Sequence, residues 1–506
     1  MLTTGDHGRD LDAAEQVLRG KIVYQDYYWV YGPIMPYYYA FFYKLFGINI
    51  QSILIGKFFI NLMAGIFCYF AVATLFKPWT ALMAALGFWN FQGDFPHTYN
   101  HAGGILFIIL IIWCLMRYIH NPKTSTLWCG LIFCLALSLI KLNFGFSSLI
   151  IFIVGVFMVD QTLKVEFLLE KKLFYLFATV VLPIITFIIY WQLLHPLAPY
   201  EIAQCFPYMP QYDLPHTNSV WQALWTFTET KIQDIRNERA YLIFCILLCW
   251  CVTLTAILWF KNKLEYQQKK ILKILFVFLP LYALFNFHEY LRSGVPYRWY
   301  WAEPPLIIFI FIIFETASNS LPRFTRALFW GMIVVWIGLH SFETTANANM
   351  PRNPTQKIIG PRGGIYVSNF PDWLMTVNST TEYLNKTLKP GETFLAIPYN
   401  ILYNYLTGSP SPTRQNIFFA FIHIPPEQEL KIIEEIENAK VNTIVLAREF
   451  NSKAEAFGVF GKTHCPLLWK YIQKNFSIVE RFGYWDGDPG WSDSHGIIIL
   501  RRKFAF

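Results

Sequence analysis

The stretch AGGILFIILIIWCLMRYI, residues 102–119, decides the fold class of this chain. Its one charged residue, Arg117, lies near the end. A helix rises about 1.5 Å per residue, so a segment of this length nearly crosses the roughly 30 Å hydrocarbon core of a bilayer. Helices of soluble proteins rarely run so long without charge. The stretch therefore predicts a membrane-spanning helix.

Similar apolar blocks lie on both sides of this stretch, separated by short charged patches. The chain has 506 residues, of which 55% are hydrophobic and 15% charged, whereas soluble chains carry roughly 25% charged residues. We therefore predict a polytopic α-helical membrane protein. About ten spans are expected, at residues 52–76, 79–93, 102–119, 125–140, 144–159, 173–194, 240–260, 273–288, 304–319 and 327–344.

The charged residues between the spans predict the orientation of the chain. Lysines and arginines gather in alternate loops, which face the cytoplasm by the positive-inside rule. These loops hold Lys77; Arg117 and Lys123; Lys164, Lys171 and Lys172; Lys261, Lys263, Lys269, Lys270 and Lys273; Arg323 and Arg326. The formal charge of +8 reflects these loops, and no nucleic-acid motif accompanies it. We therefore expect a multi-pass protein of the inner (plasma) membrane with no nucleic-acid partner.

Three regions follow from this topology. Residues 1–51 are expected to form a first outer (periplasmic) loop, residues 52–345 the multi-pass domain, and residues 346–506 an outer soluble domain. No signal peptide or anchoring helix precedes the charged cluster that starts at Gly5. Because an outer segment normally follows an anchor, we expect the natural start to lie upstream, with one more N-terminal span.

The region from residue 346 onward has a different character. Its charge rises, its apolar runs shorten to strand length, and turn residues such as Pro390-Gly391 appear. Helices are expected at residues 377–389, 426–440 and 466–475, and strands at residues 393–398, 443–447, 478–482 and 496–501. This alternation predicts a C-terminal soluble α/β domain with a largely parallel sheet.

The outer segment 5–46 reads GDHGRDLDAAEQVLRGKIVYQDYYWVYGPIMPYYYAFFYKLF and carries an acid cluster, an aromatic stretch and prolines just ahead of a span. It resembles the first outer loop of the GT-C class of polyprenyl-phosphate-sugar-dependent glycosyltransferases, the relatives of protein mannosyltransferases and aminoarabinose transferases. In that family an acidic pair, a helix ending in Gly, a Tyr-x-Asp element and a Pro-containing segment follow one another. The matching residues are Asp6, Gly20, Tyr24, Asp26 and Pro33.

Two further features carry the resemblance, and two positions depart from it. Residues 297–304, YRWYWAEP, resemble an Arg-Tyr element at the start of a late span, and an outer α/β domain is common in the family. The departures are His7, where the family commonly has Glu, and Val30-Tyr31, where some relatives carry a second acid. The resemblance implies a polyprenyl-phosphate-linked sugar donor. The two departures weaken the case for a bound metal ion, so a divalent metal ion is left open as a cofactor.

The chemistry that the family implies needs a base and a cation. An acceptor hydroxyl displaces a lipid phosphate from the sugar, so a carboxylate takes the proton while cations stabilise the leaving phosphate. Asp6 is the candidate base on the family match, with inversion at the anomeric carbon. Asp10 is a second candidate, although either acid can equally cap a helix expected at residues 11–19. Asp26 is either a site carboxylate or a turn residue.

Arg298, Arg292 and Lys141 are the candidates for binding the donor phosphate. A guanidinium binds two phosphate oxygens at once. The alternative for Arg298 is an interfacial arginine next to Trp299, and the alternative for Lys141 is an ordinary loop lysine.

Several polar residues remain as auxiliary candidates. Asp94 and His101 belong to the second outer loop, where the family often supplies a second acid. His97 and His101 have the i, i+4 spacing of a helical metal site. Arg9 and His7 stand next to Asp6 and are the remaining auxiliary candidates.

The sequence suggests three possible functions. A membrane glycosyltransferase acting on a glycan, lipid or protein acceptor fits best. A transporter or flippase for a lipid-linked saccharide would want polar groups at mid-span, and the sequence has few. A non-catalytic membrane scaffold would need one span rather than about ten.

Overall fold

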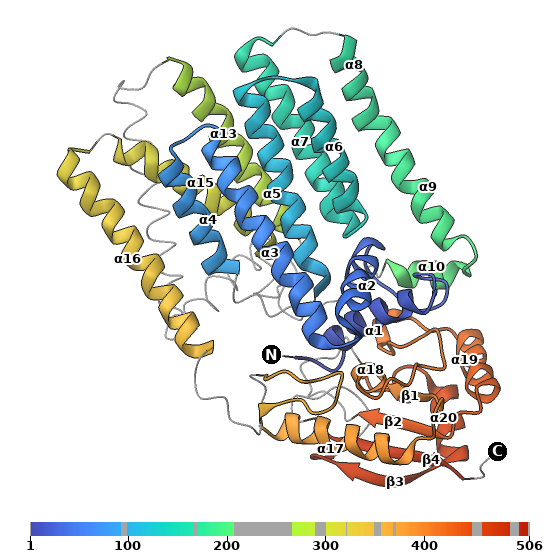
Figure 1. Ribbon diagram of the computed structural model, residues 1–506. Coiled ribbons are helices and arrows are strands. Elements are labelled where there is room, and N and C mark those ends of the chain that lie inside the picture. The colour runs from blue at the N-terminus through green and yellow to red at the C-terminus, as the bar shows by residue number, and fades with distance from the viewer. Residues whose placement is uncertain are drawn as a thin grey trace.

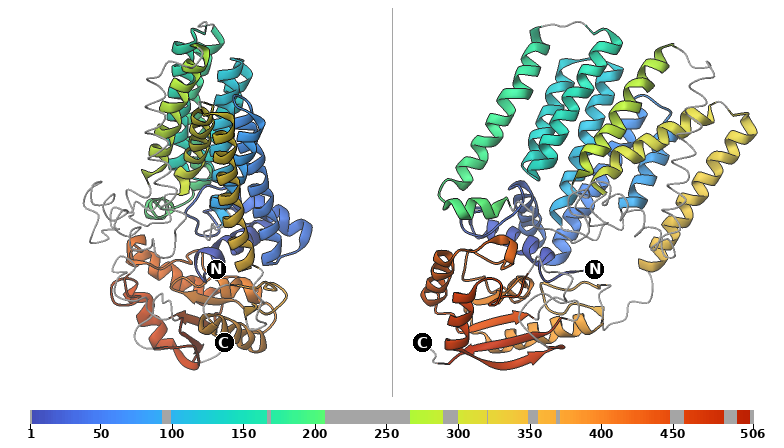
Figure 2. Two further views of the ribbon diagram at one scale, coloured as in Figure 1. Left: turned by 90° about the vertical axis from the view of Figure 1, so that its left-hand side faces the viewer. Right: turned by 180° about the vertical axis from the view of Figure 1, so that it is seen from behind.

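The computed structural model describes residues 2–92, 99–165, 169–206, 266–288, 300–319, 321–348, 356–367, 371–447, 458–485 and 495–503. Membrane-type helices pack side by side in a bundle, and a small α/β domain formed by the C-terminal part lies at one end of it (Figure 1). The first helices of the chain lie between these two parts. The two views of Figure 2 show the same arrangement.

The predicted spans reappear as helices wherever the structure describes them. The helices are α3 (Ile50–Ala73), α4 (Pro78–Gln92), α5 (Tyr99–His120), α6 (Thr124–Ser138), α7 (Leu142–Leu163), α8 (Leu169–Leu176), η1 (Phe177–Val181), α9 (Leu182–Leu194), α13 (Tyr266–Asn286), α15 (Glu303–Ser318) and α16 (Arg323–Ala348). The expected span 240–260 lies outside the described residues.

Within the described residues, five helices are long and apolar enough to cross a membrane. They are Ile50–Ala73, Tyr99–His120, Leu142–Leu163, Leu169–Leu194 and Tyr300–Ser318. The polytopic fold is therefore confirmed, and the count of ten spans stays a prediction.

Helix α5, which contains the stretch that decided the fold class, lies in the middle of the bundle. Residues from Tyr99 to Ile119 are buried along most of its length. Near its N-terminal end, a Cβ added to Gly104 would collide with the ring of Trp301. The absence of a side chain at Gly104 lets α5 and the start of α15 approach closely, as small residues do between membrane helices.

The first outer segment is more helical than the sequence predicted. Helix α1 runs over Asp6–Leu18, whereas we expected it to begin at residue 11, and α2 runs over Ile34–Phe46 within the aromatic stretch. The start of α1 packs closely on the C-terminal domain, because a Cβ at Gly8 would meet the backbone of Leu402. Tertiary packing has thus overridden the low helix propensity of the glycines. Asp10 lies inside the helix, so the N-cap alternative for it is wrong.

The C-terminal domain has all of the predicted helices and strands. Its elements are α17 (Pro371–Thr387), β1 (Phe394–Ile397), α18 (Leu402–Thr407), η4 (Ala420–Ile422), α19 (Pro426–Asn438), β2 (Thr443–Ala447), α20 (Pro466–Asn475), β3 (Phe476–Phe482) and β4 (Ile497–Arg502). Among them, α18 and the short helix η4 were not predicted from the sequence.

The prediction of a largely parallel sheet is wrong. The strand order is β1-β2-β4-β3, with β1 and β2 parallel and both pairings of β4 antiparallel. A parallel pair usually needs a helix in its crossover connection, whereas residues 483–496 between β3 and β4 read GYWDGDPGWSDSHG, a sequence of turn residues without a helical pattern. The last two strands therefore pair antiparallel.

One hydrophobic core joins the C-terminal domain to the first outer segment. It contains Leu11 of α1, Tyr39 of α2 and Tyr99 of α5, together with Leu402 and Tyr403 of α18. Helix α1 is thereby enclosed between the membrane bundle and the C-terminal domain. This enclosure positions the candidate site.

Candidate functional site

Helix α1 places Asp6, Arg9 and Asp10 on one face, because residues three and four apart are neighbours on a helix. The Arg9 Nη1 donates to Asp6 Oδ1 at 3.2 Å, and Nε and Nη2 donate to Asp10 Oδ1 at 3.1 and 2.9 Å. The other oxygen of Asp10 accepts from the backbone N–H of Asn100 at 3.2 Å. One arginine therefore holds two carboxylates.

The two carboxylates differ in access to solvent. The Asp6 side chain is 46% exposed, whereas those of Asp10 and Arg9 are 2% and 4% exposed. Burial raises the pKa of Asp10 to about 6, against the opposing effect of Arg9. Burial alone would lower the pKa of Arg9, but Tyr399 and Asp10 outweigh it and raise that pKa. Asp6 is thus the accessible member, and Arg9 is a fixed buried cation.

Tyr399 brings the C-terminal domain into this cluster. Its hydroxyl accepts from Arg9 Nη1 at 2.9 Å and donates to Asp6 Oδ1 at 2.8 Å. Nothing in the sequence near Asp6 pointed to a residue 393 positions later. Only the packing of α1 on this domain identifies it.

An aromatic group surrounds Lys141, which immediately precedes α7. Its Nζ lies 5.7 Å from the ring centroid of Tyr31, 5.1 Å from that of Phe144 and 5.1 Å from that of Trp301. The guanidinium of Arg9 lies 4.7 Å from the same Tyr31 ring. Two cations therefore approach one tyrosine, and cation–π attraction favours both positions.

His101 adjoins this aromatic group, and His7 does not appear in it. His101, in the first turn of α5, has its Nδ1 2.7 Å from the hydroxyl of Tyr300, and its ring is 5.2 Å from that of Tyr31. His7 pairs instead with Thr3, 3.0 Å from its hydroxyl, and packs edge-on against Tyr99. The candidate site in the described residues thus comprises Asp6, Arg9, Asp10, Tyr31, His101, Lys141, Trp301 and Tyr399.

The remaining candidates lie apart from this site or outside the described residues. Asp26 is exposed, and its Oδ2 accepts from the backbone N–H of Ile22 at 2.6 Å, which is the geometry of the turn alternative. Asp94, Arg292, Arg298 and His97 fall outside the described residues. In the part of the chain that the structure describes, no three His, Cys, Asp or Glu residues gather in a possible metal site.

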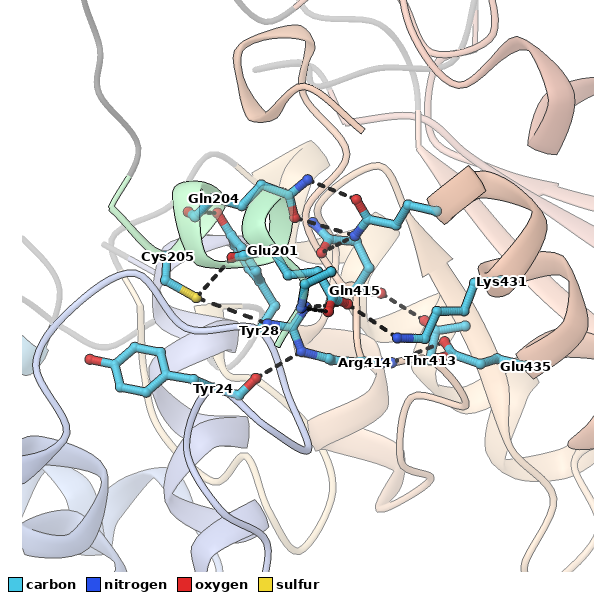
Figure 3. Close-up of polar contacts among 12 residues, drawn as sticks. Tyr24, Tyr28, Glu201, Gln204, Cys205, Thr413, Arg414, Gln415, Lys431 and Glu435 are labelled. Atoms are coloured by element: carbon cyan, nitrogen blue, oxygen red, sulfur yellow. Dashed lines mark hydrogen bonds and ion pairs between the residues drawn. The ribbon is translucent and has the colours of Figure 1, made fainter. Parts of the chain in front are cut away.

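A second polar junction ties the same outer segment to the C-terminal domain (Figure 3). Arg414 donates to the carbonyl of Tyr24 at 2.7 Å and lies 3.4 Å from Glu201 of α10 (Pro199–Cys205). Lys431 of α19 lies 3.3 Å from the same carboxylate. The backbone N–H of Tyr28 donates to the carbonyl of Arg414 at 2.9 Å. Trp29 and Tyr31 directly follow this junction in the sequence.

Comparisons with known proteins place this geometry in context. Residues 31–191 match the family described as dolichyl-phosphate-mannose-protein mannosyltransferase. A search of curated proteins finds no match. The solved structure of ArnT from Cupriavidus metallidurans bound to undecaprenyl phosphate matches with a TM-score of 0.53, and its apo state with 0.51. In each case the identity is 10%, and the alignment covers 98% of this chain and 93% of the other.

The family match begins at Tyr31, so it includes His101 and Lys141 and leaves out the acids of α1. The resemblance drawn from the outer loop and the layout of the chain is confirmed by both comparisons. The chain has the fold of a GT-C membrane glycosyltransferase, with the sequence pattern of the dolichyl-phosphate-mannose-protein mannosyltransferase family over residues 31–191.

Proposed function

We propose that this protein transfers a sugar from a polyprenyl-phosphate donor to an acceptor hydroxyl at the outer face of the membrane. One observation carries the proposal. An accessible carboxylate, Asp6, is held by Arg9, and Arg9 lies next to the aromatic group that surrounds a second cation, Lys141. The family match and the ArnT-like fold support the reaction class.

Asp6 is the proposed base. A base must reach the acceptor proton, and Asp6 is the accessible carboxylate of the α1 cluster. Arg9 and Tyr399 both contact its Oδ1, so Oδ2 takes part in neither of those bonds. Asp10 is buried against Arg9, which suits it to hold the arginine rather than to meet substrate. Asp26 binds its own turn.

Lys141 is the proposed phosphate-binding cation among the described residues. All three donor nitrogens of Arg9 already bind Asp6, Asp10 or Tyr399. The Lys141 ammonium faces the rings of Phe144 and Trp301, which can lie along an apolar carrier chain while the ammonium meets its phosphate. Arg298 and Arg292 remain proposed contributors, and Arg298 stands three residues before Trp301 in the sequence.

The proposed reaction is a single displacement. The acceptor oxygen bonds to the anomeric carbon, the bond from that carbon to the phosphate oxygen breaks, and the acceptor proton goes to Asp6. The polyprenyl phosphate leaves with its charge stabilised by Lys141. Attack opposite the leaving group inverts the anomeric carbon. A hydroxyl on a glycan, lipid or protein fits this chemistry equally.

The proposed location is the inner membrane, with the C-terminal domain on the periplasmic side. Tyr399 of that domain bonds directly to Asp6 and Arg9 of α1. The domain and the candidate site must therefore lie on the same side of the membrane, and the distribution of lysines and arginines predicts that this is the outer side.

The proposal is tested by transfer of labelled sugar from a panel of polyprenyl-phosphate donors by purified protein in detergent or nanodiscs. Asp6→Asn is expected to lower kcat by about a hundredfold or more, because the base is lost. Asp26→Asn is the matched control, since Asp26 lies in a turn of the same segment, and near-parental turnover is expected.

Full turnover by Asp6→Asn would overturn the assignment of the base. No turnover by the parent with any donor would overturn the function. Movement of the donor across the membrane without transfer would favour the transporter.

A further inference from the structure

We propose that Tyr399 of the C-terminal domain is a positioning residue that holds the Asp6 carboxylate for glycosyl transfer, so that this domain completes the membrane site. The inference rests on the proposed function and extends it, because no residue of the C-terminal domain was part of the expected site. Tyr399 need not touch the substrate to act.

The hydrogen bonds form a directed chain. Arg9 Nη1 donates to the Tyr399 oxygen at 2.9 Å, and the Tyr399 hydroxyl donates to Asp6 Oδ1 at 2.8 Å. Donation from a guanidinium polarises the hydroxyl and strengthens its own bond to the carboxylate. Burial raises the pKa of Tyr399 well above its ordinary value, with Asp6 adding to the effect, so the hydroxyl keeps the proton that it donates.

This chain also orients the carboxylate. Arg9 and Tyr399 both bond to Oδ1, and two donors at one oxygen fix the plane of the group better than one. Oδ2 is then presented in a constant direction. A base held in a constant direction keeps its proton-accepting oxygen in line with the acceptor hydroxyl.

The ring of Tyr399 is itself held by two contacts. It packs edge-on against Phe419 at 5.3 Å between ring centroids, within a cluster that also contains Tyr28 and Ile417. It also covers the backbone of Gly5, where an added Cβ would fall on the ring. The absence of a side chain at Gly5 therefore makes room for Tyr399 at the N-cap of α1.

The C-terminal domain also contacts the start of α1. Gly5 occupies the N-cap position and has no side chain to cap the helix, and Thr3 Oγ1 accepts from the backbone N–H of His7 at 3.2 Å. Just before it, the carbonyl of Thr4 accepts from the backbone N–H of Leu402 at 3.1 Å. The C-terminal domain thus holds the turn that carries Asp6 through the Thr4 carbonyl, the Gly5 surface and the Tyr399 hydroxyl.

The decisive variant is Tyr399→Phe in the full chain, which keeps the ring contacts and removes the hydroxyl. The matched control is Tyr403→Phe, which removes another buried hydroxyl of the same domain, the one that bonds to His495 at 2.6 Å. We expect Tyr399→Phe to lower kcat roughly tenfold to thirtyfold with an unchanged KM for the donor, as for loss of a hydrogen bond to a charged group. Tyr403→Phe should keep kcat near the parental value.

A double-variant cycle separates positioning from a general effect on structure. In an Asp6→Asn background, Tyr399→Phe should cause little further loss, because the carboxylate that it positions is gone. Gly5→Ala provides a second route, since the added methyl displaces the ring, and a loss of kcat at least as large is expected. Thermal unfolding of each variant checks that the fold persists.

The outcomes for the two proposals are distinguishable. A parental kcat in Tyr399→Phe, while Asp6→Asn is inactive, would overturn the positioning role and leave the proposed function standing. Equal losses from Tyr399→Phe and Tyr403→Phe, or full additivity with Asp6→Asn, would show a structural effect and likewise overturn positioning. Absence of turnover in the parent would overturn the proposed function and this role together.

Discussion

Two arginines, Arg9 and Arg414, join the first outer segment to the C-terminal domain, and they do so in different ways. The partners of Arg414 are closed off: it donates to the Tyr24 carbonyl, and the Glu201 carboxylate near it is 5% exposed and also contacts Lys431. Arg9 is buried, but Asp6, one of its two carboxylates, is 46% exposed.

This difference distinguishes a structural contact, at Arg414, from a candidate functional site, at Arg9. At Glu201 the backbone N–H of Ala198 and two cations surround the carboxylate, so its charge is balanced by groups of the protein itself. At Asp6 one oxygen is held and the group stays open to solvent. A buried ion pair by itself is weak support for either stability or function. The informative feature is the one partner left within reach of a substrate.

The largest effect is expected from substituting the two arginines themselves. Arg9→Lys keeps the charge but loses the fork that reaches Asp6, Asp10 and Tyr399 together. We expect kcat for sugar transfer to fall by about a hundredfold, the usual cost of a misplaced reacting group. Arg414→Lys is the matched control and should stay within roughly threefold of the parent, since Arg414 contacts none of the site acids. Equal losses in the two variants would contradict the distinction.

The next effect is the pH dependence that Asp10 gives to stability. Its pKa in the folded state is about 6, above the ordinary value of 3.8. Below about pH 4 the group is protonated in both states and contributes nothing. Between about pH 4 and 6 the unfolded chain releases the proton while the folded chain keeps it, so the free energy of unfolding falls, by on the order of 3 kcal/mol, and levels off above.

Thermal unfolding of the detergent-purified protein from pH 4 to 8 measures this slope. Asp10→Asn should remove the part due to Asp10, so the difference in melting temperature between variant and parent should grow between pH 4 and 6. A difference that is constant with pH would show that burial does not raise the pKa of Asp10.

The smallest effect is expected from a substitution at the second junction, and it tests whether that junction is only structural. Glu201→Gln removes the charge shared by Arg414 and Lys431, and Lys431 can turn to water because its side chain is half exposed. The free energy of unfolding should fall by about 1 to 3 kcal/mol. The kcat of the folded fraction should be unchanged, as measured by transfer normalised to monodisperse protein. A selective loss of kcat without loss of stability would place Glu201 in the site instead.

The sequence predicted the parts of the fold that depend on local pattern. Runs such as residues 102–119 correspond closely to α5, and the strand expected at residues 443–447 coincides with β2. The prediction of strand direction was wrong. The sequence did contain a sign of antiparallel pairing, because no helical pattern lies between the last two expected strands. Helix α2 was not predicted, because its tyrosines and phenylalanines are typical of a membrane interface and gave no clear helical pattern. Tertiary packing stabilises this helix.

The candidate site was predictable to the same extent. Asp6, Arg9 and Asp10 have helical spacing, so their proximity follows from the sequence if α1 begins at Asp6. The meeting of Arg9 and Lys141 at Tyr31, and the bond from Tyr399 to Asp6, depend on contacts between distant segments. No single-sequence pattern encodes such contacts, because they arise only from how the domains pack.

The enclosure of α1 between the bundle and α18 also bears on how the protein is made. Asp6 is synthesised before Tyr399, which follows it 393 residues later. At roughly 5 to 20 residues per second, the ribosome needs about 20 to 80 s to cover that interval. During this time α1 lacks the surface that covers Gly5 and Gly8. The nascent chain therefore assembles its membrane helices first, and the site is completed only when the final domain has emerged and docked.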